Sequence, residues 1–222
     1  MPEAKTLRGR DARREAILDA ASEVFLEEGY AAASMSTIAA RVGGSKATLY
    51  TYFKSKEELF EAYVHRHCSW LRGETFALLA DSEDVATALT RLGVSYLSMV
   101  MSDYNLRHFR MITAEAERSP KIGQIFYKSG PESGASRLAG FLEQAQADGL
   151  LRMDDPMRAA HQFTALCQNR LLKARLCAAA EEPSQSEVEA EVASAVKVFL
   201  AAYAVPEAAA LRQTPGLAGM KR

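Results

Sequence analysis

The nine residues SKATLYTYF, at positions 45–53, decide how the N-terminal part of this chain folds. So short a stretch does not form a stable helix alone. Leu49 and Phe53 are four positions apart, so on a helix they share one apolar side that can attach it to a core. Ser45 is a good N-cap, because its hydroxyl can accept a free amide of the first turn. The stretch therefore predicts a short helix whose other, hydroxyl-rich side faces outward.

The residues before this stretch, 34–44, predict another short helix followed by a turn. Ser34 predicts the start of a helix over Met35–Val42, and Gly43-Gly44 predicts its end. A capped short helix, a glycine turn and a second short helix form the pattern of a helix-turn-helix. Because the second helix of that motif enters the major groove of DNA, the sequence predicts a DNA-binding region.

The outward side of the second helix carries side chains that suit DNA. Lysine donates to guanine or phosphate, hydroxyls suit phosphate, and a threonine methyl or tyrosine ring can touch a thymine methyl. The small Ala47 lets the backbone approach the bases. The other candidates are Lys46, Thr48, Tyr50, Thr51 and Tyr52. A merely solvated face is the alternative, but two exposed tyrosines between a glycine turn and a cap have little structural purpose.

Positive charges flank the motif. Ser55 and Glu58 have the spacing of a capping box, which predicts a long helix from there to about residue 80. Lys56 falls in the first turn of that helix, where the helix dipole disfavours a cation, so a phosphate contact would explain it. On the other side, a basic arm precedes and starts the first helix. Its cations are Lys5, Arg8, Arg10, Arg13 and Arg14.

Helical periodicity continues along the whole chain and strand signals are scarce, so the predicted fold class is all-α. Gly130-Pro131 must bend or break the helix over 122–147, either as a kink or as a loop between two helices. The residues at 1–9 and 206–222 are expected to be a mobile arm and a mobile tail. The predicted helices cover 10–28, 35–42, 46–53, 56–80, 85–101, 106–116, 122–147, 156–180 and 186–204.

Composition limits the class of protein. The chain has 222 residues with a formal net charge of -1, so any nucleic-acid surface must be a local patch. The 3 cysteines show no CxxC pattern, so a disulfide framework is not expected. A signal-peptide pattern and a run of about 18 apolar residues are both missing, so we expect a soluble, cytoplasmic protein without membrane contact.

The run STIAARVGGSKATLYTYFKSKEELF, residues 36–60, resembles the DNA-binding region of the TetR family of bacterial regulators, and the resemblance covers roughly residues 10–70. Two departures occur: Gly44 stands where a branched apolar residue is usual, which is expected to loosen the turn, and Tyr52 stands where histidine is frequent. By position, the resemblance implies base contacts by Lys46, Ala47, Thr48 and Tyr50, and phosphate contacts by Ser34, Ser45, Thr51, Tyr52 and Lys56. Arg10 of the basic arm is a further phosphate candidate.

Members of this family are all-α homodimers, which implies an N-terminal three-helix helix-turn-helix DNA-binding domain and a C-terminal helical ligand-binding and dimerisation domain. Here these would be residues 10–56, with the start of a linking helix to about 70, and residues 57–205. The runs at 109–132 and 149–163 resemble the AefR-like C-terminal subgroup, which implies a repressor, such as one of an efflux or stress-response operon, but no particular ligand.

A ligand cavity and a dimer interface are both predicted in the C-terminal part. Apolar residues at helical spacing are more often simply core, so each cavity residue has that alternative. The helices over 156–180 and 186–204 carry apolar stripes, which could form a four-helix interface with a second copy or be buried within one subunit. The cavity candidates are Trp70, His108, Phe109, Met111, Phe126, Tyr127, His161, Phe163 and Cys167.

No cofactor, metal or catalytic group is expected. His65 and Cys68 lie three apart on a helix, but no second cluster completes a tetrahedral metal site. A nucleophile–base pair and a phosphate loop are also missing, so we expect no enzyme. The sequence therefore indicates a homodimeric repressor that a small, largely apolar ligand releases from a palindromic operator. An activator, or an all-α small-molecule-binding or enzymatic protein, is the alternative.

Overall fold

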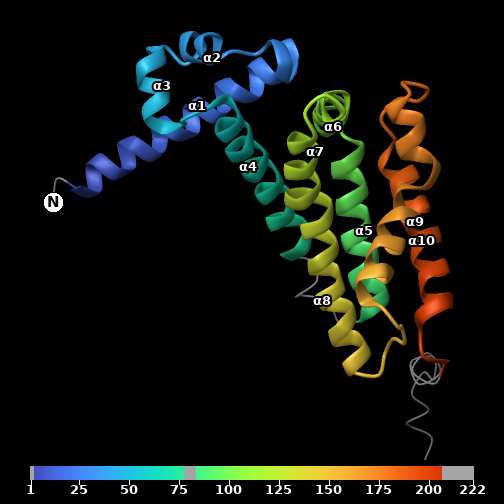
Figure 1. Cartoon of the computed structure of the whole chain (residues 1–222). Helices are drawn as coiled ribbons and strands as arrows, with labels where there is room; N and C mark the ends of the chain where they lie inside the picture. Colours follow the sequence, from blue (N-terminus) through green and yellow to red (C-terminus); the bar gives the residue numbers. More distant parts are fainter. Residues whose placement is uncertain (1–2, 78–83, 207–222) are drawn as a thin grey trace, which may run out of the picture. The chain divides into compact units, whose positions relative to one another are not determined.

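The computed structural model describes the backbone of residues 3–77 and 84–206, and the side chains there except those of 3–8, 69–77 and 170. Within these ranges the chain is helical (Figure 1), and its β-type pairing is one bridge between Leu151 and Ala204. The all-α prediction is confirmed. The side chains of Lys5, Arg8 and Trp70, and the predicted tail after residue 206, lie outside the described residues.

The helices follow one another with short connections. They are α1 (Glu3–Ala32), α2 (Met35–Arg41), α3 (Lys46–Tyr52), α4 (Lys56–Ala77), α5 (Val85–Met101), α6 (Asp103–Ala116), α7 (Pro120–Tyr127), a π-helical turn (Lys128–Glu132), α8 (Ser133–Ala147), α9 (Pro156–Leu176) and α10 (Gln185–Tyr203).

Gly29 ends the regular part of α1, as predicted, but a further helical turn follows it. Its φ of 78° and ψ of 162° interrupt the helix, and the chain then continues helically to Ala32. Glycine suits this position because a side chain disfavours a positive φ. The predicted start of α1 at Arg10 was too late, because the helix extends back to Glu3.

Gly130-Pro131 is neither a simple kink nor a loop. Both residues lie inside the π-helical turn Lys128–Glu132, which connects α7 to α8. Proline lacks the amide that an α-helix requires at this point, and the wider π register absorbs the interruption. The helical path therefore continues through the proline.

The described helices form two compact units, which we call unit 1 and unit 2. Unit 1 comprises the described parts of residues 1–71 and 103–131, and unit 2 those of 72–102 and 132–222. By packing, α6 and α7 therefore belong with α1–α3 and the first part of α4. The predicted boundary at residues 56 and 57 separates a DNA-binding domain from a ligand-binding domain. It is a boundary between functions and stays a prediction.

The core of unit 1 joins the helix-turn-helix to α4, α6 and α7. Phe25 of α1 lies with its ring 5.3 Å from that of Phe60 of α4, in an edge-to-face arrangement. This buried cluster also includes Ile17, Val24, Ile38, Leu49, Phe53, Leu59, Tyr63, Ile112 and Ile122. The motif thus rests on a large aromatic and aliphatic core, which compensates for the shortness of α2 and α3.

Unit 2 has its own core between α5, α8, α9 and α10. Phe163 of α9 and Phe199 of α10 pack edge to face at 5.3 Å. Gly93 of α5 lies so close to α10 that a Cβ there would be 2.7 Å from the Cγ1 atom of Val192. The predicted apolar stripes of the last two helices are therefore largely buried within the subunit, with Leu166 and Leu200 half-buried at the edge of the core.

Candidate nucleic-acid interface

α3 is held to unit 1 as its sequence predicts. Ser45 caps it, since its hydroxyl accepts the Thr48 N–H at 3.0 Å and lies 2.9 Å from the Thr48 hydroxyl. Leu49 and Phe53 are only 1% and 2% exposed. The apolar side of α3 is therefore fixed in the core, and this fixes which side chains face outward.

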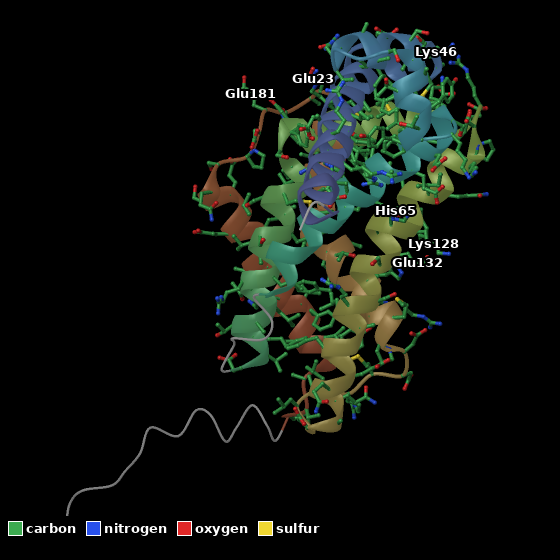
Figure 2. All side chains as sticks on the ribbon, turned by 90° about the vertical axis from the view of Figure 1, so that its left-hand side faces the viewer. Glu23, Lys46, His65, Lys128, Glu132 and Glu181 are labelled. Atoms are coloured by element: carbon green, nitrogen blue, oxygen red, sulfur yellow. The ribbon has the colours of Figure 1, made fainter. Side chains whose placement is uncertain are left out.

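The outward side of α3 is polar and open to solvent. Lys46, Ala47, Thr48, Tyr50 and Thr51 are exposed, with Tyr50 at 43%; Lys46 is labelled in Figure 2. The Lys46 ammonium lies 6.0 Å from the centroid of the Tyr50 ring, at the outer limit of a cation–π contact. The Thr51 hydroxyl donates to the Thr48 carbonyl at 2.7 Å. All four residues expected to meet bases are thus accessible to solvent.

α2 is placed by a cap and by an ion pair. The Ser34 hydroxyl accepts the Thr37 N–H at 3.0 Å. Arg41, at the end of α2, lies 2.6 Å from a Glu27 oxygen and 3.1 Å from a Glu23 oxygen, both on α1. The hydrogen bond from Arg41 holds the pKa of the Glu27 carboxyl below its usual value. These pairs connect α2 to α1.

Arginines of α1 lie against both ends of α3. The Arg10 guanidinium is 6.0 Å from the ring centroid of Tyr52, and that of Arg14 is 5.2 Å from the ring of Phe53. Arg13 donates to the Gly43 carbonyl at 3.4 Å. Arg10 and Arg14 are exposed and Tyr52 is half-buried. The basic residues of α1 are therefore part of the same surface as α3.

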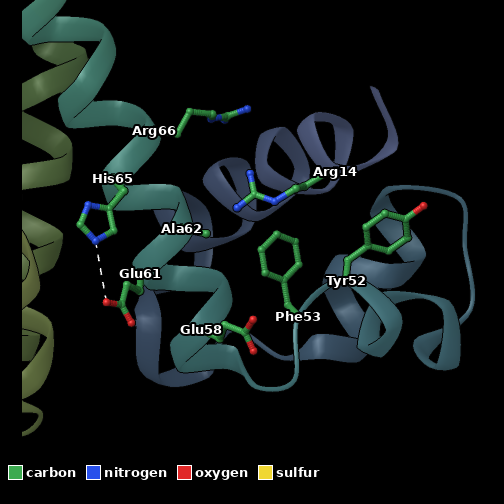
Figure 3. Close-up of a pocket in the computed structure, with 8 residues that line it drawn as sticks. All are labelled: Arg14, Tyr52, Phe53, Glu58, Glu61, Ala62, His65 and Arg66. Carbon is green, nitrogen blue, oxygen red and sulfur yellow. Dashed lines mark ion pairs between the residues drawn. The ribbon is translucent and has the colours of Figure 1, made fainter. Parts of the chain in front are cut away.

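A cleft of about 570 Å³ opens beside the end of α3 (Figure 3). Arg14, Tyr52 and Phe53 line it from one side, and Glu58, Glu61, Ala62, His65 and Arg66 line it from α4. Its lining contains both cations, Arg14 and Arg66, and carboxylates, Glu58 and Glu61, so it presents no single charge to a ligand.

Lys56 has a structural role that sequence reasoning did not anticipate. Its ammonium donates to the carbonyls of Tyr30, Ala31 and Ala33 at 2.8, 3.2 and 3.0 Å. It also lies 4.4 Å from the centroid of the Tyr30 ring. The cation thus satisfies the free carbonyls at the end of α1. A phosphate contact by Lys56 stays a prediction, but its place in the first turn of α4 has this second explanation.

α4 is fastened to α1 and to the π-helical turn. Arg66 pairs with Glu15 at 3.0 Å and with Asp19 at 2.8 Å. His65 lies 3.8 Å from a Glu61 oxygen, as the dashed line in Figure 3 marks, and 3.0 Å from the Ser129 hydroxyl. Cys68 is buried and is not part of a disulfide. Among the described residues, no group of three or more potential ligands could hold a metal ion.

Two histidines stack inside unit 1. The rings of His67 on α4 and His108 on α6 lie 4.5 Å apart. Burial, and then the charge of His108, lower the pKa of His67 to about 4, and burial lowers the pKa of His108. His108 Nδ1 bonds to the Tyr104 carbonyl at 2.7 Å, while its buried Nε2 has no partner in the described part of the chain. Both rings are therefore neutral at pH 7.

The predicted cavity residues occupy different surroundings. In unit 1, Phe109 and Phe126 pack edge to face at 5.9 Å, and Tyr127 is 52% exposed. In unit 2, Cys167 is buried and His161 is exposed on α9. Burial raises the pKa of the Cys167 thiol to about 12. Tyr127 and His161 thus lie at the surface. None of the described candidates lines the cleft beside α3 or the groove along α9 and α10.

A groove of about 580 Å³ runs along α9 and α10 in unit 2. Leu166 and Ala165 line it from α9, and Val198 and Ala202 line it from α10. Val198 is 51% exposed. The Tyr203 hydroxyl donates to Gln162, and Asn169 donates to Glu191 at 3.0 Å, so two cross-helix hydrogen bonds join the groove's walls. The groove itself is thus lined largely by small and apolar residues.

Sequence reasoning missed two features of unit 1. Glu23 and Glu27 are four positions apart on α1, a spacing that lets them share one cation, so the Arg41 pair had a weak sequence signal. The stacking of His67 on His108 had none, because the two rings come from helices far apart in sequence.

Comparison with known proteins agrees with this geometry. The sequence profile of bacterial regulatory proteins of the tetR family matches residues 17–63, and that of the AefR-like transcriptional repressor C-terminal domain matches residues 87–205. The solved structure of the flavonoid-responsive regulator FrrA superposes with a TM-score of 0.79 at 35% identity, covering 88% of this chain and 99% of that one. None of the described helices is long and apolar enough to cross a membrane.

Two further relatives match over shorter stretches. The transcriptional activator FasR of Mycolicibacterium smegmatis is 55% identical over 58 residues, which is 26% of each chain. An uncharacterized transcriptional regulator of Mycobacterium tuberculosis is 36% identical over 132 residues, which is 60% of this chain and 62% of the relative. The chain therefore matches about a quarter and about three fifths of the lengths of these two curated relatives.

Proposed function

This chain belongs to the tetR family of bacterial regulatory proteins and is a DNA-binding transcriptional regulator, and we propose that it is a homodimeric repressor released from a palindromic operator by a small, largely apolar molecule. The observation that carries the proposal is the arrangement of α3. Its apolar side is buried in unit 1, and its polar side is exposed between the N-cap Ser45 and the C-cap Phe53. A helix presented in this way fits the major groove.

The outward residues of α3 have separate roles in this proposal. Lys46, Ala47, Thr48 and Tyr50 meet base edges, because they lie on the exposed side of the helix. Ser34, Ser45, Thr51, Tyr52 and Arg10 contact backbone phosphates. Phosphate contacts fix the register of the protein on the duplex and base contacts supply the sequence preference.

A homodimer follows from the need for specificity. One short helix reads few bases, whereas two copies related by a two-fold axis read two half-sites about 34 Å apart, one turn of the duplex. The groove along α9 and α10, with the exposed Val198 in it, is the surface that supports such a pairing. Each copy would present the same surface, as a two-fold interface requires.

Repression is favoured over activation by the C-terminal half. The profile that matches residues 87–205 describes repressors, whereas the similar activator matches over 58 residues only. A ligand that binds the DNA-free conformation more tightly shifts the population toward it and releases the operator. Flavonoids are the first class of ligand to test, because a similar regulator is flavonoid-responsive.

For the ligand cavity we retain the buried or half-buried candidates of unit 1, which are His108, Phe109, Met111 and Phe126. Phe163 and Cys167 lie in the core of unit 2. The exposed Tyr127 and His161 have less support from the structure. The regulator acts in the cytoplasm, where its operator is.

A gel-shift titration with DNA from upstream of the chain's own coding region tests the proposal. The protein is expected to form one discrete complex at low salt, and addition of an effector is expected to dissolve it. An all-α enzyme or ligand carrier without DNA function would instead leave every duplex unshifted at low salt. An activator would bind in the same way but raise transcription from that DNA in vitro.

A further inference from the structure

The backbone conformation at Gly44 does not require a glycine. In the turn between α2 and α3, Gly43 takes the left-handed conformation, with φ of 67°, whereas Gly44 does not. A Cβ at Gly44 would nevertheless lie 2.8 Å from the Nη2 atom of Arg13. Its next contacts, with Val42 and Ala39 at 3.6 and 4.0 Å, are ordinary. A side chain at position 44 would therefore displace the end of the Arg13 side chain, whereas the backbone of the turn accepts one.

Arg13 reaches this turn from α1 with most of its hydrogen-bonding capacity unused. Its single polar contact within the described part of the chain is the 3.4 Å bond to the Gly43 carbonyl, which is long. By contrast, Arg41 and Arg66 each pair with two carboxylates. A guanidinium has five N–H donors, so the half-buried Arg13 places a cation with further donors near the start of α3.

The surroundings of Arg13 suit a phosphate. Gly43, Ser45 and Lys46, which surround Gly44 in sequence, are all exposed. A guanidinium matches phosphate oxygens in a two-pronged geometry that lysine does not reproduce. In the proposed binding mode α3 lies in the major groove. The phosphate backbone of the DNA strand that borders this groove then passes the first residues of α3.

We propose that Arg13 is a phosphate-binding residue of the DNA interface, and that Gly44 is present to admit its guanidinium. The inference rests on the proposed DNA binding and adds a second contact from α1, beside that of Arg10, to those of α2 and α3. The glycine that was expected to loosen the turn thus makes room for a side chain that covers it.

A double-mutant cycle tests this inference. Arg13→Gln, Gly44→Ala and the double variant are compared with the wild type by fluorescence anisotropy of a labelled upstream duplex, over a series of KCl concentrations. Arg13→Gln is expected to weaken binding about tenfold and to lower the salt slope of log K by about 0.9 per lost phosphate contact, or about 1.8 per dimer. Arg13→Lys should restore part of that slope, and Arg152→Gln, an equal charge change on unit 2, should change neither quantity.

Gly44→Ala is expected to weaken binding about threefold or more, because its methyl group displaces the guanidinium. Its melting temperature should not fall, since only the end of a flexible side chain must move. In the Arg13→Gln protein the same substitution should have no further effect. An unchanged salt slope in Arg13→Gln, or an equal effect of Gly44→Ala in both proteins, overturns the inference alone. A wild type that binds no duplex overturns the proposed function, and the inference with it.

Discussion

The ring of His67 on α4 stacks on the ring of His108 on α6, with 4.5 Å between centroids and 16° between planes. The Tyr63 ring stacks on the His108 ring at 5.6 Å, and the Tyr104 ring packs against it in a tilted arrangement at 4.3 Å. Two protonated imidazoles could not remain so close in a buried site, because each would repel the other without solvent to screen them. The contact between α4 and α6 therefore depends on neutral histidines.

The stability of the protein should fall in mild acid because of this pair. The ordinary pKa of histidine is 6.5, and that of His67 is lowered to about 4. Between these values the unfolded chain binds a proton that the folded chain does not, so stability is lost as the pH falls from 6.5 toward 4. Replacement by phenylalanine keeps a stacking ring that cannot titrate. His67→Phe should therefore lose about 2 kcal/mol less stability than the wild type between pH 7 and pH 5.

Urea denaturation at the two pH values measures this difference. Burial is the first cause of the shift, followed by the charge of His108, so His108→Phe should also reduce the acid sensitivity. Equal losses in the wild type and in both variants would show that the stack does not control stability in this range.

Neighbouring residues of α3 should separate folding from DNA binding. Leu49 is 1% exposed, so Leu49→Ala leaves a cavity and should cost about 2–5 kcal/mol. Tyr50 is 43% exposed, so Tyr50→Ala should change the stability by less than about 0.5 kcal/mol. In the gel shift, Tyr50→Ala should weaken the complex markedly. The reverse result, a destabilised Tyr50→Ala that binds normally, would mean that the two sides of α3 are wrongly assigned.

Lys56 should stabilise the protein even without DNA. Its ammonium holds three carbonyls at the end of α1, and hydrogen bonds to a charged group are worth about 1.5–3 kcal/mol in favourable cases. Lys56→Gln should therefore lower the free energy of unfolding by about 2 kcal/mol in DNA-free protein. The salt slope of DNA binding then reveals whether Lys56 also meets phosphate, because only a phosphate contact changes it. An unaltered unfolding free energy would refute the capping role.

A charge in the groove of α9 and α10 should separate the proposed homodimer. Val198→Asp places a carboxylate on an exposed apolar position that lines the groove, and burial of an unpaired charge in an interface is costly. Ala193→Asp is the matched control, since Ala193 is also exposed on α10 but does not line the groove. Sedimentation velocity should show monomers for Val198→Asp and dimers for Ala193→Asp. Dimers of both variants would place the interface elsewhere.

Local signals in the sequence identified most of the DNA-binding region. Ser34 and Ser45 specify their helices by accepting amides three residues ahead, and Leu49 and Phe53 specify the buried side by their spacing. These features depend only on near neighbours in the chain, so the sequence predicts them. The site roles of these side chains stay predictions, because they depend on a partner that the chain itself does not contain.

Long-range contacts account for what could not be predicted. The carbonyl groups that Lys56 binds lie 23 to 26 positions earlier in the chain, at the end of α1, and they explain why a lysine stands there. The side chain that occupies the space beside Gly44 is that of Arg13, which is 31 positions away. Neither pairing has a periodicity that a sequence reveals. Lys56 was therefore interpreted from the helix dipole, and Gly44 from its departure from the family pattern. For the same reason the π-helical path through Pro131 could not be distinguished from a kink or a loop.

The central claim, that the exposed side of α3 reads a palindromic operator, is tested most directly by selection from a pool of random DNA duplexes, followed by sequencing of the bound fraction. The wild type is expected to enrich one inverted repeat, and a Lys46→Ala, Tyr50→Ala protein of normal melting temperature is expected to lose that preference while keeping salt-sensitive binding to phosphates. Enrichment of the same repeat by both proteins, or of no sequence by the wild type, would contradict the claim.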